Sequence, residues 1–311
     1  MIATDMHDPY PSRLPGASEK PPVLPRHDPV VHSQWSPDAP LSRAQSDAFD
    51  RDGYLMLEGL FSQAETAILQ AEAARLLRDP SALDPETIVS EPGGSEVRSI
   101  FAIHEQNAVI ARLAADARLA DIARYLLADD VTIHQSRLNY KPGFDGKEFY
   151  WHSDFETWHM EDGMPRMRAL SMSILLTENS VLNGPLMVMP GSHRHYVSCI
   201  GETPDAHYLQ SLKKQEVGVP DRERLEQLAA DHGIVAPVGK PGSVILFDCN
   251  MMHGSSSNIT PFARSNAFIV YNAASNRLVT PFGGTAPRPA FIAARQAQPV
   301  QPAHGHLEIA A

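Results

Sequence analysis

The chain has 311 residues, of which 43% are hydrophobic and 20% charged, a composition typical of a globular protein with a large core. Its formal charge of −11 argues against binding to nucleic acid or to an anionic membrane surface. With only two cysteines, the chain cannot be a disulfide scaffold, and it cannot carry a cysteine-rich zinc site or an iron–sulfur site.

The first 40 residues are predicted to form an extended arm or to be disordered, because nine of the 26 prolines lie between positions 9 and 40. The start of the chain shows no apolar run of the kind found in signal peptides, and no stretch reaches the ~18 apolar residues of a membrane span, so we expect a cytoplasmic protein. A proline-rich tail is expected over residues 281–311. This leaves residues 41–280 as a single catalytic domain, with a helical flank (41–130) and a β core (131–280).

The helical flank contains three sequence signals. The run from Ser62 to Glu65 has the pattern of a capping box and predicts a helix that extends to Asp79. Residues 107–127 are rich in Ala, Leu and Arg and predict two further helices. The apolar run 54–57 between helical segments predicts a short strand.

Strand-like runs separated by Gly-, Pro- and Asn-containing turns follow residue 130. The predicted strands cover residues 131–140, 149–158, 169–176, 186–189, 234–238, 243–247 and 267–272. One helix is predicted over residues 220–231, with Gly233 as its C-terminal stop. Seven short strands with regular turns favour a sandwich, a jelly roll or a barrel with helices packed on its outside.

A candidate metal site begins with His152 and Asp154. In a strand, residues two apart point to the same side, so the imidazole and the carboxylate would lie side by side. His253, 101 residues downstream, would complete a two-histidine, one-carboxylate set of ligands, which suits non-haem iron(II). The bare His-x-Asp pattern is expected about once by chance in such a chain, and its alternative reading is a hydrogen-bonded pair without a metal.

Two cations are candidates for binding a co-substrate. An iron site of this kind needs a chelating partner such as 2-oxoglutarate, whose far carboxylate requires a positive charge. Arg264, eleven positions after His253, offers a planar fork that binds a carboxylate through two hydrogen bonds. Lys141 could contact the same carboxylate as a point charge. The alternatives are a surface arginine and a solvated turn lysine.

Residues 149–165 read FYWHSDFETWHMEDGMP. This string resembles the signature of the ectoine hydroxylase family, which belongs to the phytanoyl-CoA-dioxygenase-like branch of the iron(II)/2-oxoglutarate oxygenases. Further matches lie at 183–184, 186–187, 190–193, 211–213 and 215–216, and the resemblance extends from about residue 28 to residue 283. It implies a double-stranded β-helix core, that is, a cupin-like jelly roll, flanked by helices.

The resemblance also implies three groups of site residues. The implied iron ligands are His152, Asp154 and His253. The implied 2-oxoglutarate contacts are Lys141 and Arg264, with Asn139 and Ser255 as further contacts. The implied substrate contacts are Gln135 and Trp158.

The chemistry of the implied substrate agrees with the last two residues. Ectoine is a cyclic amidinium that carries a carboxylate, and a desolvated cation over the indole of Trp158 would gain up to ~2 kcal/mol. The amide oxygen of Gln135 can accept a hydrogen bond from a ring N–H. The alternatives are core packing for Trp158 and a solvated strand position for Gln135.

The activity implied by the resemblance is hydroxylation of ectoine to 5-hydroxyectoine by a homodimeric dioxygenase. Iron(II) would be the cofactor, 2-oxoglutarate and O2 the co-substrates, and succinate and CO2 the co-products. The product is a compatible solute that protects against osmotic stress. The alternatives are the same chemistry on another small cyclic amino acid, and a non-catalytic β-barrel that binds a metal or a small molecule.

Overall fold

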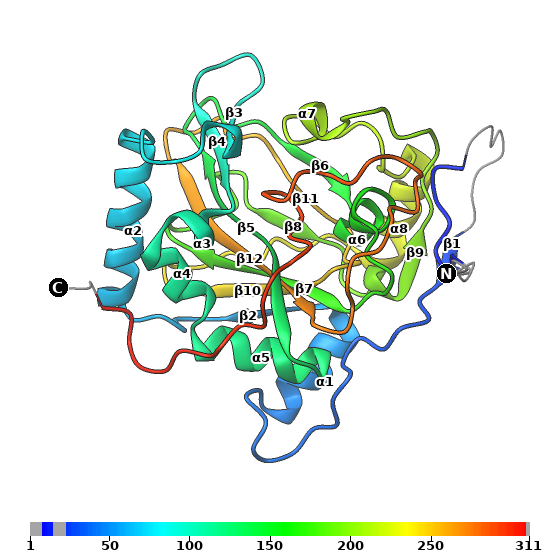
Figure 1. The fold of residues 1–311 in the computed structure, drawn as a ribbon, viewed down its shortest axis with the longest axis horizontal. Coiled ribbons are helices and arrows are strands. Elements are labelled where there is room, and N and C mark those ends of the chain that lie inside the picture. The colour runs from blue at the N-terminus through cyan, green and yellow to red at the C-terminus, as the bar shows by residue number, and fades with distance from the viewer. Residues whose placement is uncertain (1–7, 15–22, 309–311) are drawn as a thin grey trace.

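A computed structural model describes residues 8–14 and 23–308. Parts of the predicted N-terminal arm, residues 1–7 and 15–22, lie outside the described residues, as do residues 309–311 of the predicted tail. Figure 1 shows a sheet of long strands in the middle of the molecule, with helices around it.

Two antiparallel sheets form the jelly-roll core. The larger sheet has seven strands in the order β2 (Tyr54–Leu57), β10 (Val244–Asp248), β7 (Ala169–Leu175), β12 (Arg264–Ala273), β5 (Val131–Lys141), β4 (Val97–Phe101) and β3 (Ile88–Ser90). The smaller sheet has three strands in the order β6 (Phe149–His152), β11 (His253–Ser255) and β8 (Leu186–Val188). A separate pair joins β1 (Val23–Pro25) to β9 (His195–Val197).

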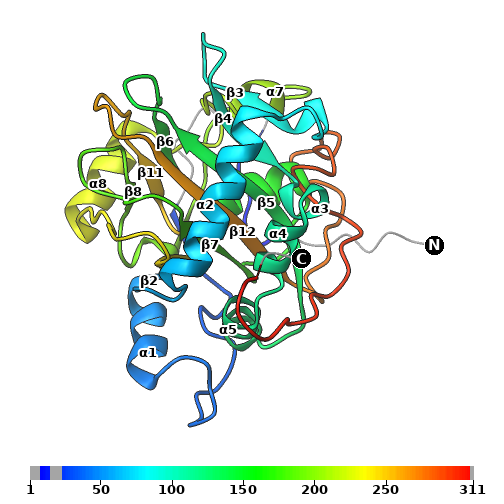
Figure 2. The same cartoon turned by 90° about the vertical axis from the view of Figure 1, so that its left-hand side faces the viewer.

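Helices from the first part of the chain cover one face of the larger sheet. They are α1 (Arg43–Asp52), α2 (Gln63–Arg78), α3 (Ile103–Gln106), α4 (Ala108–Ala114) and α5 (Ala117–Leu127). Figure 2 shows α2 in front of the strands, with α4 beside it and α5 below. Their apolar side chains join those of β5, β7, β10 and β12 in one buried cluster, whose burial is the main stabilising term of the fold.

The other short helical elements lie on the connections of the β core. They are the 3-10 turns η1 (Pro85–Thr87) and η3 (Ser192–Arg194), the α-helical elements α6 (Asp154–Thr157), α7 (Tyr208–Ser211) and α8 (Arg222–His232), and the π-helical turn η2 (Trp158–Asp162). The turn η2 continues directly from α6. No helix in the described part of the chain has the length and apolarity to cross a bilayer.

Several predicted elements are confirmed. Ser62 caps α2 by accepting a hydrogen bond from the Glu65 backbone N–H, while the Glu65 carboxylate accepts one from the Ser62 backbone N–H. The helix α8 ends at Gly233, which has a φ of 70°. The strand at 54–57 and the two helices within 107–127 are also present, as is the predicted jelly roll.

Two predicted strands are wrong. The strand predicted over residues 149–158 ends at His152, and residues 154–162 are helical. Their Phe and Trp favour strands, but Asp154 and Glu156 occupy the first helical turn, where negative side chains are stabilised. In the run 234–238, only an isolated bridge between Val188 and Val235 forms.

Both terminal segments pack against the core. Tyr10 is fully buried, and Val300 and Leu307 belong to the main apolar cluster. The C-terminal segment passes from beside α6 to α2, where the Leu307 backbone N–H donates to Glu65 (Figure 1). The division of the chain at residues 41 and 281 stays a prediction.

Candidate active site

Strand β5 separates core residues from polar residues by alternation. Leu138 and Tyr140 point into the main apolar cluster. Gln135, Asn139 and Lys141 occupy the opposite face, which is turned toward the smaller sheet. The neighbouring strand β12 follows the same rule and pairs with β5 along its length. The two sheets therefore enclose a polar cavity above an apolar core.

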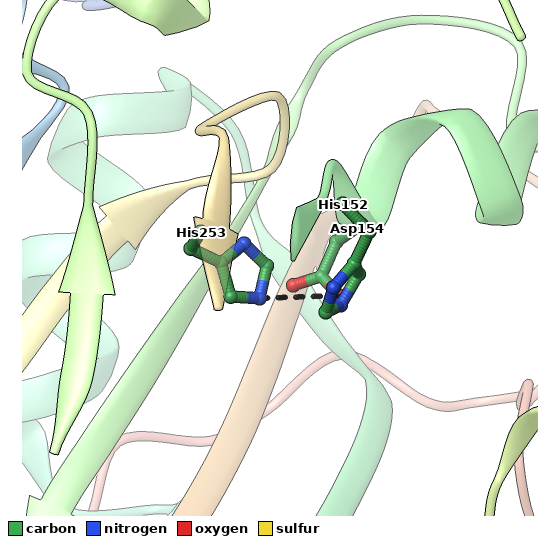
Figure 3. A group of neighbouring side chains, drawn as sticks. All are labelled: His152, Asp154 and His253. Carbon is green, nitrogen blue, oxygen red and sulfur yellow. Dashed lines mark ion pairs between the residues drawn. The ribbon is translucent and has the colours of Figure 1, made fainter. Parts of the chain in front are cut away.

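The three candidate metal ligands meet in this cavity (Figure 3). His152 ends β6, and His253 begins β11 directly opposite it in the strand ladder. Asp154 begins α6, two residues after the strand has ended. One ligand atom from each residue lies within 4.8 Å of the others. Asp154 Oδ1 lies 3.7 Å from His152 Nε2 and 4.0 Å from His253 Nε2.

The sequence analysis correctly placed the side chains of His152 and Asp154 close together, but the secondary structure that it assumed is wrong. A shared strand was expected to place their side chains on one face, but the chain changes from strand to helix between them. The strand-to-helix turn at Ser153 brings the carboxylate toward the imidazoles. The predicted third ligand, His253, begins β11, shortly after β10 has ended.

Hydrogen bonds orient all three side chains. Nδ1 of His152 donates to the Tyr150 carbonyl over 2.6 Å, and Nδ1 of His253 donates to the Met251 carbonyl over 3.0 Å. Each ring therefore keeps a lone pair on Nε2, the atom that faces the centre of the group. Ser171 Oγ donates to Asp154 Oδ2 over 3.2 Å and holds the carboxylate in place.

Charges in the site favour the protonation states that bind a metal. Burial and the neighbouring His152 lower the pKa of His253 to about 4, so its imidazole is neutral at neutral pH. Burial alone would raise the pKa of Asp154, but the two histidines and Arg137 outweigh it and hold this pKa well below its usual range. A neutral imidazole and an ionised carboxylate are donors that suit iron(II).

Arg264 lies at one end of the cavity with unused hydrogen-bonding capacity. It begins β12 opposite Lys141 and is buried. Its Nε has no hydrogen-bond partner within the described ranges. Burial, reinforced by repulsion from Arg98, lowers its pKa to about 10. A buried guanidinium of this kind fits a ligand carboxylate.

The other predicted co-substrate residues surround Arg264. Asn139 and Ser255 line the cavity, and Asn139 accepts a hydrogen bond of 2.7 Å from Ser99. Lys141 lies behind Ser255, donating to its hydroxyl over 2.8 Å and to the Ser256 carbonyl over 2.6 Å.

The two predicted substrate residues lie toward the other end of the cavity. Trp158 begins η2 and packs against the edge of His134, with ring centroids 5.0 Å apart. Gln135 donates to the Ile292 carbonyl over 2.7 Å and accepts a hydrogen bond of 2.8 Å from Arg137. Both residues line the cavity with Arg137 and Arg288.

Sequence reasoning missed these two arginines. Arg137 lies two residues from Gln135 in one strand, so alternation could have placed it in the site. Arg288 lies in the segment that was predicted to be a tail, and no local signal marks it. Its guanidinium donates to both carboxylate oxygens of Asp162 over 2.7 and 2.6 Å, which fixes its position at the cavity wall.

The connection between β9 and α8 also contributes to the cavity. Ser211, Leu212 and Gln215 line it, although the sequence analysis assigned them no role beyond the family resemblance. Gln215 Nε2 donates to Thr157 Oγ1 over 3.1 Å, which joins this connection to α6.

Comparisons with known proteins agree with this geometry. Residues 49–266 match the family model described as Phytanoyl-CoA dioxygenase. A Sphingopyxis alaskensis protein named Ectoine dioxygenase is 69% identical over 290 residues, which cover 93% of this chain and 94% of that protein. A Bordetella bronchiseptica protein of the same name is 55% identical, with 93% of each chain covered.

Solved structures extend the similarity to the fold. The crystal structure of EctD from S. alaskensis with bound Fe is 60% identical in sequence, has a TM-score of 0.87 and covers 97% of this chain and 100% of that chain. A structure of the same protein with 2-oxoglutarate and 5-hydroxyectoine matches equally well. The resemblance recognised in the sequence is confirmed.

We expect Lys141 to make the free energy of unfolding increase with pH above neutrality. Burial, with repulsion from Arg264 and Arg98, lowers its pKa to about 6. Between about pH 6 and pH 10, Lys141 is then protonated in the unfolded chain and neutral in the folded protein. The free energy of unfolding therefore rises by at most about 1.4 kcal/mol per pH unit because of this group. Thermal melting across this range should give a steeper pH profile for the wild type than for Lys141→Met. Parallel profiles would contradict the lowered pKa.

Proposed function

This chain belongs to the phytanoyl-CoA dioxygenase family, and we propose that it hydroxylates ectoine to 5-hydroxyectoine with iron(II), 2-oxoglutarate and O2, releasing succinate and CO2. The observation that carries the proposal is one cavity that combines His152, Asp154 and His253 with Arg264 and Trp158. The enzyme supplies a compatible solute, which protects cells under osmotic stress.

We assign the metal and co-substrate roles as follows. His152, Asp154 and His253 hold iron(II), which supplies the activation of O2 when 2-oxoglutarate is bound. Three protein ligands would leave positions on a bound iron for small ligands. Arg264 binds the far carboxylate of 2-oxoglutarate, and its Nε, which has no partner among the described residues, supports this assignment.

Three polar side chains complete the co-substrate end. Asn139 and Ser255 line the cavity and offer hydrogen bonds to 2-oxoglutarate. Lys141 acts through Ser255, because its ammonium group donates a hydrogen bond to the Ser255 hydroxyl and orients it. When the dianionic co-substrate binds, its negative charge favours the protonated form of this lysine.

The substrate end recognises a zwitterion. The indole of Trp158 offers its face to the amidinium of ectoine. Gln135 presents its amide beside Trp158, already oriented by Arg137 and by the Ile292 carbonyl. Arg137 and Arg288 supply positive charge for the ectoine carboxylate, since both guanidinium groups line the cavity. These contacts orient the ring and replace the water around it.

We also propose that residues 41–280 form the catalytic domain, with the described residues of segments 1–40 and 281–311 packed onto it. Arg288 then enters the site from the C-terminal segment. Tyr10 and Leu307 are buried against the body from either end of the chain.

We propose that the protein works in the cytoplasm. Its two cysteines, Cys199 and Cys249, are both buried and unpaired, which suits a reducing compartment. The co-substrate 2-oxoglutarate is a central metabolite of that compartment. Fractionation of cells that make the protein should place it there, and recovery in the secreted fraction would contradict this location.

We propose that two copies of the chain form a homodimer. Two loops that share a hydrogen bond from the Phe144 N–H to the Thr260 carbonyl carry three exposed apolar side chains, Phe144, Ile259 and Phe262. A cluster of this kind favours association.

Light scattering should give the mass of two chains for the wild type. A double variant, Phe144→Lys with Phe262→Lys, should give the mass of one chain, while Val238→Lys on another loop should leave the mass unchanged. A single-chain mass for the wild type would refute the dimer.

Incubation of the purified protein with iron(II), 2-oxoglutarate, O2 and ectoine should give hydroxylated ectoine and succinate in equal amounts. Mass spectrometry follows the gain of one oxygen, and succinate is measured in the same sample. Succinate without hydroxylated ectoine would keep the oxygenase and reject the substrate. If neither forms while iron is bound, the protein binds small molecules without catalysis.

Asp154→Ala should remove iron binding and activity while the fold is kept, because the carboxylate packs against polar neighbours at the cavity and lies outside the apolar clusters. Loss of an outer hydrogen-bond partner already costs about 10–100-fold in metal affinity, so loss of the ligand should cost at least as much. Iron content and melting temperature are measured together. The control is Asp145→Ala, an exposed residue of the turn after β5. Full iron content in Asp154→Ala would overturn the ligand assignment.

A further inference from the structure

The short N-terminal segment formed by residues 8–14 is buried far more deeply than a proline-rich arm requires. Tyr10 and Arg13 are 0% and 3% exposed, and Ser12 is 2% exposed. Figure 1 shows the N-terminal part of the chain running past β9, on the side of the molecule that carries α6. A segment this close to the site can act on it.

Arg13 binds two carboxylates of the segment that carries the substrate tryptophan. Its Nε donates to Glu156 Oε1 over 2.9 Å, and its Nη2 donates to the other oxygen of the same carboxylate. Its Nη1 donates to Glu161 Oε1 over 2.6 Å. Glu156 and Glu161 lie on either side of Trp158 in the chain. Arg13 therefore ties down both ends of the turn that presents the indole.

The same segment also holds the connection that follows β9. The Arg13 backbone N–H donates to the Cys199 carbonyl over 3.0 Å, and Nη1 donates to Thr203 Oγ1 over 3.0 Å. His207 lies 3.1 Å from Glu161 Oε1. This connection continues to Gln215, which lines the cavity. One guanidinium thus joins two separate walls of the site.

The guanidinium of Arg13 is tightly packed on the side of Gly218. Gly218, with a φ of +75°, lies so close that a Cβ there would stand 2.0 Å from Arg13 Nη2 and 2.6 Å from a Glu156 oxygen. Two buried carboxylates and the burial of Arg13 make a charged cluster in which each group depends on the others.

The turn itself cannot supply this rigidity. The elements α6 and η2 together span only residues 154–162, and a helix this short is not stable without tertiary contacts. We propose that Arg13 is a positioning residue for ectoine binding, fixing Trp158 and the 199–219 connection relative to the metal ligands. The proposal rests on the proposed function, because its kinetic readout uses ectoine.

Removal of the Arg13 fork should weaken ectoine binding selectively. Misplacement of the indole by about 1 Å is enough to lower productive binding on the order of 10- to 100-fold. We expect Arg13→Met to raise KM for ectoine by roughly that factor, with KM for 2-oxoglutarate changed by less than about twofold. Succinate should exceed hydroxylated ectoine, since the co-substrate end stays intact.

Arg13→Met alone leaves two carboxylates buried, so the double variant Arg13→Met with Glu156→Gln is measured beside it. This variant removes the charge of Arg13 together with that of Glu156, and Glu161 keeps His207 as a partner. Arg13→Lys should restore part of the ectoine affinity, because a point charge replaces a fork. The control is Arg51→Met, whose side chain is 68% exposed and pairs with the adjacent Asp52. Melting temperatures identify which variants are folded.

Limited proteolysis of the metal-free protein gives a second readout that needs no ectoine. Cleavage within residues 199–219 should be faster in the Arg13 variants than in the wild type and in Arg51→Met. A folded double variant with unchanged ectoine KM and unchanged cleavage overturns the positioning role, as does an equal rise in both KM values. Failure of the proposed function would appear differently, as a wild type that does not turn over ectoine.

Discussion

The antiparallel pairing of β6 with β11 places His152 directly opposite His253, and the arrangement of the whole site depends on this contact. The chain leaves β6 at that residue and begins a helix at Asp154, so the carboxylate reaches the two imidazoles from a different element. Backbone carbonyls fix both rings, which leaves Nε2 of each directed at the same point. Ligand geometry is therefore set by strand register and a turn, both of which are backbone properties.

The larger sheet holds apolar side chains on one face and polar side chains on the other. Alternation along β5 and β12 sends apolar residues to the helical side and polar ones to the cavity. Burial lowers the pKa of Lys141 and Arg264, which indicates that these cations are less stable here than in water. A dianionic co-substrate bound beside them offsets the free-energy cost of burying these cations. Binding of the co-substrate is therefore coupled to stabilisation of the charged forms of Lys141 and Arg264.

The sequence was most informative where local rules dominate. The Ser62 cap, the Gly233 stop and the strand at 54–57 depend on neighbouring residues, and all three are confirmed. The string around His152 identified the family and contains two of the candidate ligand residues, His152 and Asp154, although their placement on one strand was wrong. Aromatic residues after Asp154 favour a strand locally, and packing of residues 154–162 against distant segments overrides that preference.

Other contributions could not be read from local patterns. Asp162 fixes Arg288 at the cavity wall, and Glu156 and Glu161 connect Arg13 to the site. These contacts span more than 100 residues. Neither arginine lies in a motif. The prolines near both of them led to the prediction of a terminal arm and a terminal tail. Contacts of this range are decided by the fold as a whole, so they become visible only in three dimensions.

The position of Arg288 has a consequence for synthesis on the ribosome. The three candidate ligand residues and the central strand β12 have all been translated once Ala273 is added, but the arginine-lined wall still lacks Arg288 at that stage. Domains fold as units during translation, in N- to C-terminal order. A nascent chain could thus acquire a metal-binding centre before it has a complete substrate pocket. The time needed to translate the C-terminal segment separates formation of the metal-binding centre from completion of the substrate pocket.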